Sequence, residues 1–173
     1  MNPGSRPVAP LDSYDDVRGL AVRKERLHSA THEEILGGLT TDVYFVKARD
    51  VLKKAGRLNT SVTAEIFARR HGVFAGLEEI MLLLADKAVE VEALREGDEF
   101  SPREVLIRIT GPYGEFGMYE TVLLGMAASA TSWATAAREC VDAAGGKPVL
   151  CFGARHLHPA VAPVMERTAV TAG

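Results

Sequence analysis

The segment from residue 148 to the end of the chain constrains the fold most, because it contains a strand pattern without visible neighbours. Residues 148–152 (PVLCF) form a continuously apolar run, as in a strand buried on both faces. A polar loop follows at 153–158, and Pro159 suits the first turn of a helix through AVAPVMERTAV. One strand–loop–helix unit cannot bury a parallel strand by itself. We therefore expect further strands to come from another chain or from a longer protein.

The residues before this unit predict a mixture of helices and strands. The longest helix has apolar residues, many of them alanines, at helical spacing, and Gly145-Gly146 ends it. The segment from Thr31 to Glu34 has the spacing of a capping box. We expect helices at 41–56, 77–86 and 119–144, a strand at 61–67 and a small β-unit at 88–111.

The size, charge and composition of the chain exclude some classes of function. The 173 residues make one domain, or one small domain and part of a second, and 47% apolar residues suffice for a core. A net charge of −3 gives no electrostatic case for nucleic acid as the main partner. No apolar run approaches the roughly 20 residues of a membrane helix. We expect a cytoplasmic protein with no membrane or nucleic-acid partner, in which Cys140 and Cys151 are small core residues.

Several polar residues could bind an anionic or aromatic ligand, and each also has a structural explanation. Arg155, His156 and His158 lie in the loop after the expected strand, where a phosphate or carboxylate could bind, or where a charged loop could face water. Phe152 could stack on a flat ligand, although its pattern favours a place in the core.

Three further pairs of residues each have a functional and a structural explanation. Asp42 and Tyr44 could bind a polar aromatic, or serve as a helix N-cap and a half-buried tyrosine, which the pattern favours. Arg69 and its neighbour Arg70 could bind phosphate or end a strand in solvent. His28 and His32 have the spacing of a helical metal pair, but without a third ligand we expect no metal site.

Taken together, four segments resemble nicotinate phosphoribosyltransferase and, more broadly, the type II phosphoribosyltransferases, which include the quinolinate and nicotinamide enzymes. These segments are TTDVYF, then VTAEIFARR with GVFAGLEE, then YETVLLG with SATSWATAAR, and finally CFGARHLHP. Their order and approximate spacing agree with the family from about residue 31 to the end. The FG-x-R piece after a glycine-ended helix is the strongest element of the set.

The resemblance implies an α+β N-terminal domain followed by an irregular α/β barrel. In this chain it predicts a flexible N-terminal segment at 1–30, the α+β domain at 31–144 and the first strand–helix unit of an incomplete barrel at 145–173. It also implies a head-to-tail homodimer whose active sites use residues of both subunits. The implied reaction transfers a phosphoribosyl group from phosphoribosyl pyrophosphate to nicotinate, as a step of NAD biosynthesis, usually coupled to ATP and with magnesium on the pyrophosphate.

The resemblance also implies roles for individual residues. Tyr44 matches the tyrosine that stacks on the pyridine ring, beside the acidic residue Asp42, and Phe152 matches the aromatic that the second subunit lends. Arg155 matches the arginine near the base and the ribose phosphate. Arg69 matches an arginine that reaches phosphate groups, and His156 and His158 occupy the adjacent loop. No residue is assigned as a catalytic nucleophile, since this chemistry needs none.

The family barrel continues well beyond the length of this chain, so we expect the chain alone not to be a competent enzyme. Alternatives are a non-catalytic interaction domain, one half of a split enzyme, or a small-molecule-binding domain without transfer chemistry. Quinolinate and nicotinamide are the alternative substrates. Nicotinate is preferred because the sequence shows no cluster of basic groups for the two carboxylates of quinolinate.

Overall fold

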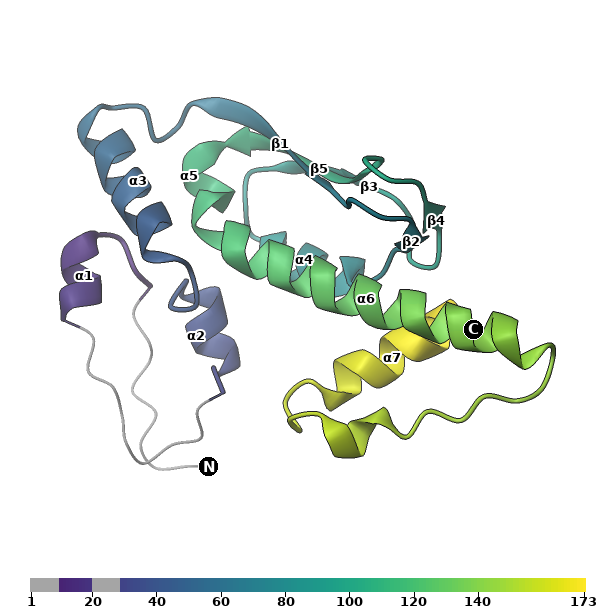
Figure 1. The fold of residues 1–173 in the computed structure, drawn as a ribbon. Helices are drawn as coiled ribbons and strands as arrows, with labels where there is room; N and C mark the ends of the chain where they lie inside the picture. Colours follow the sequence, from purple (N-terminus) through teal and green to yellow (C-terminus); the bar gives the residue numbers. More distant parts are fainter. Residues whose placement is uncertain (1–9, 20–28) are drawn as a thin grey trace. The chain divides into compact units, whose positions relative to one another are not determined.

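The computed structural model describes residues 10–19 and 29–173, which form two compact units (Figure 1). The first unit contains the chain up to Val62 together with 86–89 and 111–122. The second contains 63–85, 90–110 and 123–173. The stretch 31–144, expected as one α+β domain, contributes residues to both units.

Short helices dominate the first unit. They are α1 (Tyr14–Arg18), α2 (His32–Leu36), α3 (Val43–Lys54), α5 (Tyr113–Phe116) and the 3₁₀ turn η1 (Gly117–Tyr119). The core of the unit joins Phe45 and Val46 of α3 to Met118 of η1. The expected capping box is confirmed at α2, where the Glu34 N–H donates to Thr31 Oγ1 and the Thr31 N–H to the Glu34 carboxylate.

The segment expected to be flexible contains an ordered helix. Residues 14–18 form α1, which begins with a capping box between Ser13 and Asp16. Tyr14 and Val17 pack against the core of the unit, and the Tyr14 N–H donates to Asp50 of α3 at 3.0 Å. A capped turn gains stability from the apolar face that packs on its neighbours, and the flexibility expected for the segment as a whole stays a prediction. Residues 1–9 and 20–28, including His28, lie outside the described part of the chain.

Antiparallel strands and the long helix build most of the second unit. The strands are β1 (Ser61–Phe67), β2 (Gly72–Val73), β3 (Glu90–Ala93), β4 (Glu99–Phe100) and β5 (Val105–Pro112). The helices are α4 (Leu77–Leu84), the 3₁₀ turn η2 (Gly153–His156), α7 (Ala162–Ala172) and α6 (Glu120–Ala144), whose residues 120–122 belong to the first unit. One sheet has the order β1-β5-β3, with β3 antiparallel to β5 and Glu90 opposite Thr110. A second pairs β2 with β4, with Gly72 opposite Phe100.

Small residues of α6 allow close packing in this unit. Ala130 and Ala134 are completely buried and contact Val73 and Ala75, which follow in the chain after β1. Gly76 completes this contact: its φ is +98°, and a Cβ there would lie 2.9 Å from the Cβ of Ala130. The Ala-rich composition of α6 thus permits a backbone segment to lie directly on the helix.

The strand expected at 148–152 does not form, and these residues are irregular and exposed. A strand needs a hydrogen-bonded neighbour, and none of the described residues pairs with this run. The helix after the loop begins at Ala162 rather than at Pro159, with Pro163 in its first turn. Cys140 and Cys151 are both exposed, so their assignment to the core is wrong.

Two further expectations concern membranes and the remaining elements. Within the described residues, no helix has both the length and the apolarity to cross a membrane. The expected strand at 61–67 is confirmed as β1, and the expected helices are confirmed as α3, α4 and α6.

Replacing Gly76 by alanine is expected to destabilise the protein. The new Cβ would require an unfavourable positive φ and would meet Ala130 at 2.9 Å, which predicts a loss of about 2 kcal/mol of unfolding free energy. Gly125→Ala is the matched control, because a Cβ at this helical position meets no atom within 4 Å. Chemical denaturation should show Gly125→Ala as neutral or stabilising by up to about 1 kcal/mol. Equal stability of the two variants would contradict the close packing at Gly76.

The hydrogen bonds of the Glu96 carboxylate predict that acid lowers the stability of the fold. Glu96 accepts hydrogen bonds from the Gly76 and Glu78 N–H groups at 3.2 and 3.1 Å, and from Arg167 of α7 at 2.7 Å. Burial alone would raise the pKa of Glu96, but Arg167 and the two N–H groups hold this pKa below its ordinary value of 4.5.

A lowered pKa in the folded state means that the ionised Glu96 stabilises the fold above the unfolded-state value. This stabilisation is lost as the pH falls through the folded-state pKa. Unfolding free energy measured from pH 7 to pH 3 should therefore fall more steeply in the wild type than in Glu96→Gln. If the unfolding free energies of the two proteins fall in parallel with pH, the hydrogen bonds of Glu96 do not contribute to stability.

Candidate functional site

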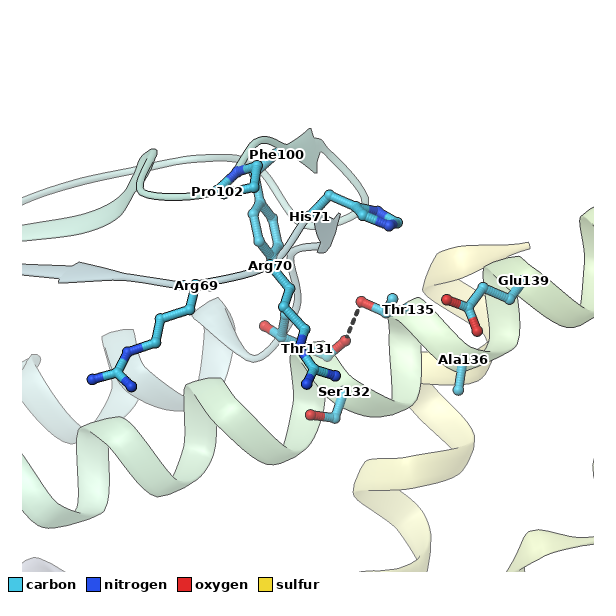
Figure 2. Close-up of a pocket in the computed structure, with 11 residues that line it drawn as sticks. Arg69, Arg70, His71, Phe100, Pro102, Thr131, Ser132, Thr135, Ala136 and Glu139 are labelled. Carbon is cyan, nitrogen blue, oxygen red and sulfur yellow. Dashed lines mark hydrogen bonds between the residues drawn. The ribbon is translucent and has the colours of Figure 1, made fainter.

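An open pocket in the second unit lies between α6 and the basic segment that follows β1 (Figure 2). Its volume is about 800 Å³. Its walls come from the segment after β1, from β4 with the residues that follow, and from the middle of α6. The lining residues are Ala68, Arg69, Arg70, His71, Phe100, Pro102, Thr131, Ser132, Thr135, Ala136 and Glu139. In Figure 2 the side chain of Arg70 points toward α6, whereas that of Arg69 takes a different direction.

Two threonines of α6 fix the backbone that follows the basic residues. Thr135 Oγ1 accepts a hydrogen bond from the Val73 N–H at 3.0 Å and donates to the Thr131 carbonyl at 2.7 Å. Thr131 Oγ1 accepts from the Ala75 N–H at 3.3 Å and donates to the Ala75 carbonyl at 3.2 Å. Gly72 is required here, since a Cβ would lie 2.6 Å from Thr135 Oγ1. The segment between β1 and α4 is therefore held to the helix by hydrogen bonds on consecutive turns.

The pocket has the electrostatic character of an anion site. Arg69, Arg70 and His71 are exposed, and none forms an ion pair or side-chain hydrogen bond with another described residue. The Ser132 hydroxyl adds a further hydrogen-bond donor, and Glu139 is the acidic residue among the lining residues. Arginine side chains bind phosphate oxygens through charge-assisted hydrogen bonds, so the pocket can accept a phosphorylated ligand.

A second group of predicted site residues lies at the start of α3, in the first unit. Asp42 is the N-cap residue of α3, and the side chain of Tyr44 is 56% exposed. The Tyr44 ring lies 4.1 Å from the Phe45 ring, measured between centroids, at a tilt of 40°. The side chain is therefore close to half-buried, as expected, and the exposed part of the ring is available to stack on a ligand.

The carboxylate of Asp42 does not cap its own helix but interacts with α6. The Asp42 N–H donates to Thr121 Oγ1 at 3.1 Å, and this hydroxyl donates to Asp42 Oδ2 at 3.2 Å. Burial raises the pKa of the Tyr44 phenol, and the carboxylates of Glu120 and Asp42 raise it further. The charged side chains around Tyr44 are thus negative, whereas the pocket of the second unit is lined by positive ones.

The third group lies around η2, in the second unit. Phe152 is 61% exposed, and the Arg155 guanidinium carbon lies 5.2 Å from the centroid of its ring. Phe152 is thus not part of the core as its pattern suggested, because the unpaired run at 148–152 leaves it on the surface. His158 Nδ1 accepts a hydrogen bond from the Ala160 N–H at 3.2 Å, in the loop before α7.

The predicted site residues therefore fall into three groups. Asp42 and Tyr44 lie in the first unit, Arg69 lines the pocket of the second unit, and Phe152 and Arg155 form a pair at η2. His156 ends η2 and does not line the pocket. Within the described residues, no group of three His, Cys, Asp or Glu side chains is placed to hold a metal ion.

Sequence reasoning missed the α6 wall of the pocket. Thr131, Ser132, Thr135 and Glu139 gave no signal as a ligand site, because small polar residues on a helix equally suit close packing. The four-residue spacing from Thr131 to Thr135 and from Thr135 to Glu139, which places all three on one helix face, is the feature that could have indicated them.

Comparison with known proteins identifies the relatives of this chain. Residues 42–131 match the family model described as the N-terminal domain of quinolinate phosphoribosyl transferase. A nicotinate phosphoribosyltransferase of Mycobacterium tuberculosis (strain H37Rv) is 28% identical over 169 residues, covering 79% of this chain and 38% of that relative. The chain thus spans well under half the length of this curated relative.

Solved structures show the same architecture. A nicotinate-nucleotide pyrophosphorylase from Pyrococcus furiosus is 42% identical with a TM-score of 0.80, covering 84% of this chain and 39% of that one. The human nicotinic acid phosphoribosyltransferase is similar in fold, with 23% identity and a TM-score of 0.70, over 77% of this chain and 35% of that one.

The threonine contacts at the pocket can be tested by one pair of variants. Thr135→Val keeps the shape of the side chain but leaves the Val73 N–H without its acceptor, so we expect a loss of about 1–2 kcal/mol of unfolding free energy. Thr135→Ser keeps the hydroxyl and should retain most of the stability. Urea unfolding of the two variants measures the difference, and equal losses would show that the hydroxyl is not required.

Proposed function

Since this chain belongs to the type II phosphoribosyltransferases, through its quinolinate phosphoribosyl transferase N-terminal domain, we propose that it acts in phosphoribosyl transfer for NAD biosynthesis. The observation that carries the proposal is the family match over 42–131, which contains Asp42, the exposed ring of Tyr44 and the basic pocket residue Arg69. The activity proposed is that of the whole protein, since the relatives are more than twice as long as the aligned part.

The proposed reaction joins the ring nitrogen of nicotinate to C1 of the ribose of phosphoribosyl pyrophosphate, and pyrophosphate leaves. In this proposal Tyr44 stacks on one face of the pyridine ring, and Phe152 of a second protomer covers the other face. An exposed tyrosine and an exposed phenylalanine in different units support this arrangement, because flat rings bind well between two aromatic faces. The proposed assembly is a homodimer with shared active sites.

Basic side chains supply the second part of the proposal. Arg155 lies against the Phe152 ring, where its guanidinium can pair with the carboxylate of the base or with the ribose phosphate. Arg69, with Arg70 beside it in the pocket, is proposed to bind phosphate groups, and His156 and His158 to add donors near η2. Fixed positive charges stabilise the departing pyrophosphate most as its charge develops. No protein nucleophile is needed for this displacement.

Magnesium and ATP enter the proposal through the family. Mg²⁺ keeps several water ligands and binds largely through phosphate oxygens, so we propose that it accompanies the pyrophosphate as part of the substrate. It would supply charge neutralisation of the leaving group. Coupling to ATP hydrolysis and a cytoplasmic location stay predictions.

Nicotinate is the proposed base, and quinolinate is the second candidate. The curated relative named as a nicotinate phosphoribosyltransferase supports nicotinate. The description of the matching family model favours quinolinate. Nicotinamide remains the third base to compare.

Ligand-dependent thermal stability tests the proposal on the purified 173-residue chain, with its mass followed by light scattering. Nicotinate, phosphoribosyl pyrophosphate and Mg²⁺ together at about ten times their dissociation constants should raise the melting temperature by a few degrees. Tyr44→Ala should lose the shift caused by nicotinate, and Arg69→Gln the shift caused by phosphoribosyl pyrophosphate.

Arg57→Gln is the matched control, because Arg57 is exposed and lies outside the three groups of site residues. Its ligand-induced shifts should equal those of the wild type. A wild-type chain whose melting is indifferent to every ligand would overturn the proposal that these residues bind the substrates. A shift with quinolinate and none with nicotinate would establish the second candidate.

A further inference from the structure

Some polar groups that line the pocket of the second unit are occupied by the fold, and others are available to a ligand. Thr131 Oγ1 is bonded to the Ala75 backbone, and Thr135 Oγ1 accepts from the Val73 N–H. The Ser132 hydroxyl, by contrast, is on an exposed side chain and bonds to no other residue that the structure describes. The helix wall of the pocket therefore offers Ser132, and not the threonines, to a ligand.

The available polar groups of α6 lie at the two ends of one line on the helix surface. Ser132, Ala136 and Glu139 are spaced by four and then three residues, so they share a helix face, and all three are exposed and line the pocket. The seven residues from Ser132 to Glu139 correspond to about 10 Å along the helix axis. Ala136 lies between them with a side chain of one methyl group. The surface from the hydroxyl to the carboxylate is thus open to a ligand.

The basic residues on the other wall stand on a segment that is fixed on both sides. Before them, the Ala68 carbonyl accepts from the Arg103 N–H at 2.8 Å, and after them, the Val73 N–H donates to Thr135 at 3.0 Å. Figure 2 shows the Arg70 side chain extending toward α6. A ligand that binds Arg70 therefore meets a backbone that is already ordered, which reduces the entropic cost of binding.

The opposite charges in the pocket do not neutralise each other. Arg70 and Glu139 both line it, yet neither forms an ion pair with another described residue. A guanidinium and a hydroxyl donate hydrogen bonds to phosphate oxygens, whereas a carboxylate accepts hydrogen bonds and repels phosphate. The pocket therefore suits a ligand that has a phosphate at one end and neutral hydroxyl groups at the other.

We propose that this pocket binds a sugar monophosphate, with its phosphate on Arg70 and Ser132, and that Glu139 is a specificity-determining residue that accepts hydrogen bonds from the sugar hydroxyls. Pyrophosphate is disfavoured, because it is negative at both ends and would bring one phosphate toward Glu139. The inference rests on the proposed function, since the ribose 5-phosphate part of phosphoribosyl pyrophosphate is the ligand that would occupy the pocket.

Calorimetric titration of the 173-residue chain with ribose 5-phosphate and with inorganic pyrophosphate tests the inference. We expect ribose 5-phosphate to bind more tightly, and Glu139→Gln to lower the ratio of the pyrophosphate to the ribose 5-phosphate dissociation constant about fivefold, as for an exposed charge. Glu79→Gln removes the same charge from an exposed position of α4 outside the pocket and should leave the ratio unchanged.

The outcomes separate this inference from the proposed function. An unchanged ratio in Glu139→Gln would overturn the inference. A wild-type chain that is stabilised by phosphoribosyl pyrophosphate but does not bind ribose 5-phosphate would also overturn it, and would leave the proposed function intact. A chain that binds neither compound would overturn both.

A second variant tests the path of the ligand along α6. Ala136→Leu fills the surface between Ser132 and Glu139, and leucine is a good helix former, so the helix should be retained. Ribose 5-phosphate should bind about tenfold more weakly, whereas inorganic phosphate, which needs only the Arg70 end, should bind as before. Ala128→Leu is the matched control at an exposed position of α6 outside the pocket. Equal ribose 5-phosphate affinities in the two leucine variants would overturn the inference.

Discussion

The hydrogen bonds between the threonines of α6 and the backbone of Val73 in β2 and of Ala75 after it are the contacts on which the second unit depends. They hold Val73 and Ala75 directly on the helix, where Ala130 and Ala134 leave room for the chain. Because Arg69 and Arg70 immediately precede this fixed segment, the same bonds position the basic wall of the pocket. Larger side chains on this helix face would separate the segment from the hydroxyls, so packing and the candidate anion site have a common origin.

The candidate binding regions have opposite electrostatic character. The pocket of the second unit carries Arg69 and Arg70, and the surroundings of Tyr44 in the first unit carry the carboxylates of Asp42 and Glu120. Under the proposed function, this separation suits a reaction between a polyanionic sugar phosphate and a weakly charged aromatic base. The arginines would then attract the sugar phosphate, whereas the carboxylates near Tyr44 would repel this polyanion more strongly than the singly charged base.

Sequence patterns predicted those helices and strands whose formation depends mainly on interactions between residues close together in the chain. Helical spacing and the terminal glycines predicted α6 to within a residue or two, and alternation predicted β1. The resemblance to type II phosphoribosyltransferases, drawn from four short segments, is confirmed by the family match over 42–131. The errors arose where an element depends on distant partners: the run at 148–152 has strand composition, but no described strand pairs with it. Cys140 and Cys151 were misplaced because apolar neighbours in the sequence do not determine which side of an element is buried.

The sequence by itself determined the types of elements, the family and the identity of the aromatic and basic residues, because these follow from residue order and short-range preference. Only the tertiary structure decided which side chains share a surface. Within the first unit, it placed Thr121 against Asp42, although the two residues are 79 positions apart in the chain. It also placed α6 beneath Arg70 and left Phe152 exposed against Arg155. These contacts depend on how remote segments pack, which no local pattern of residues encodes.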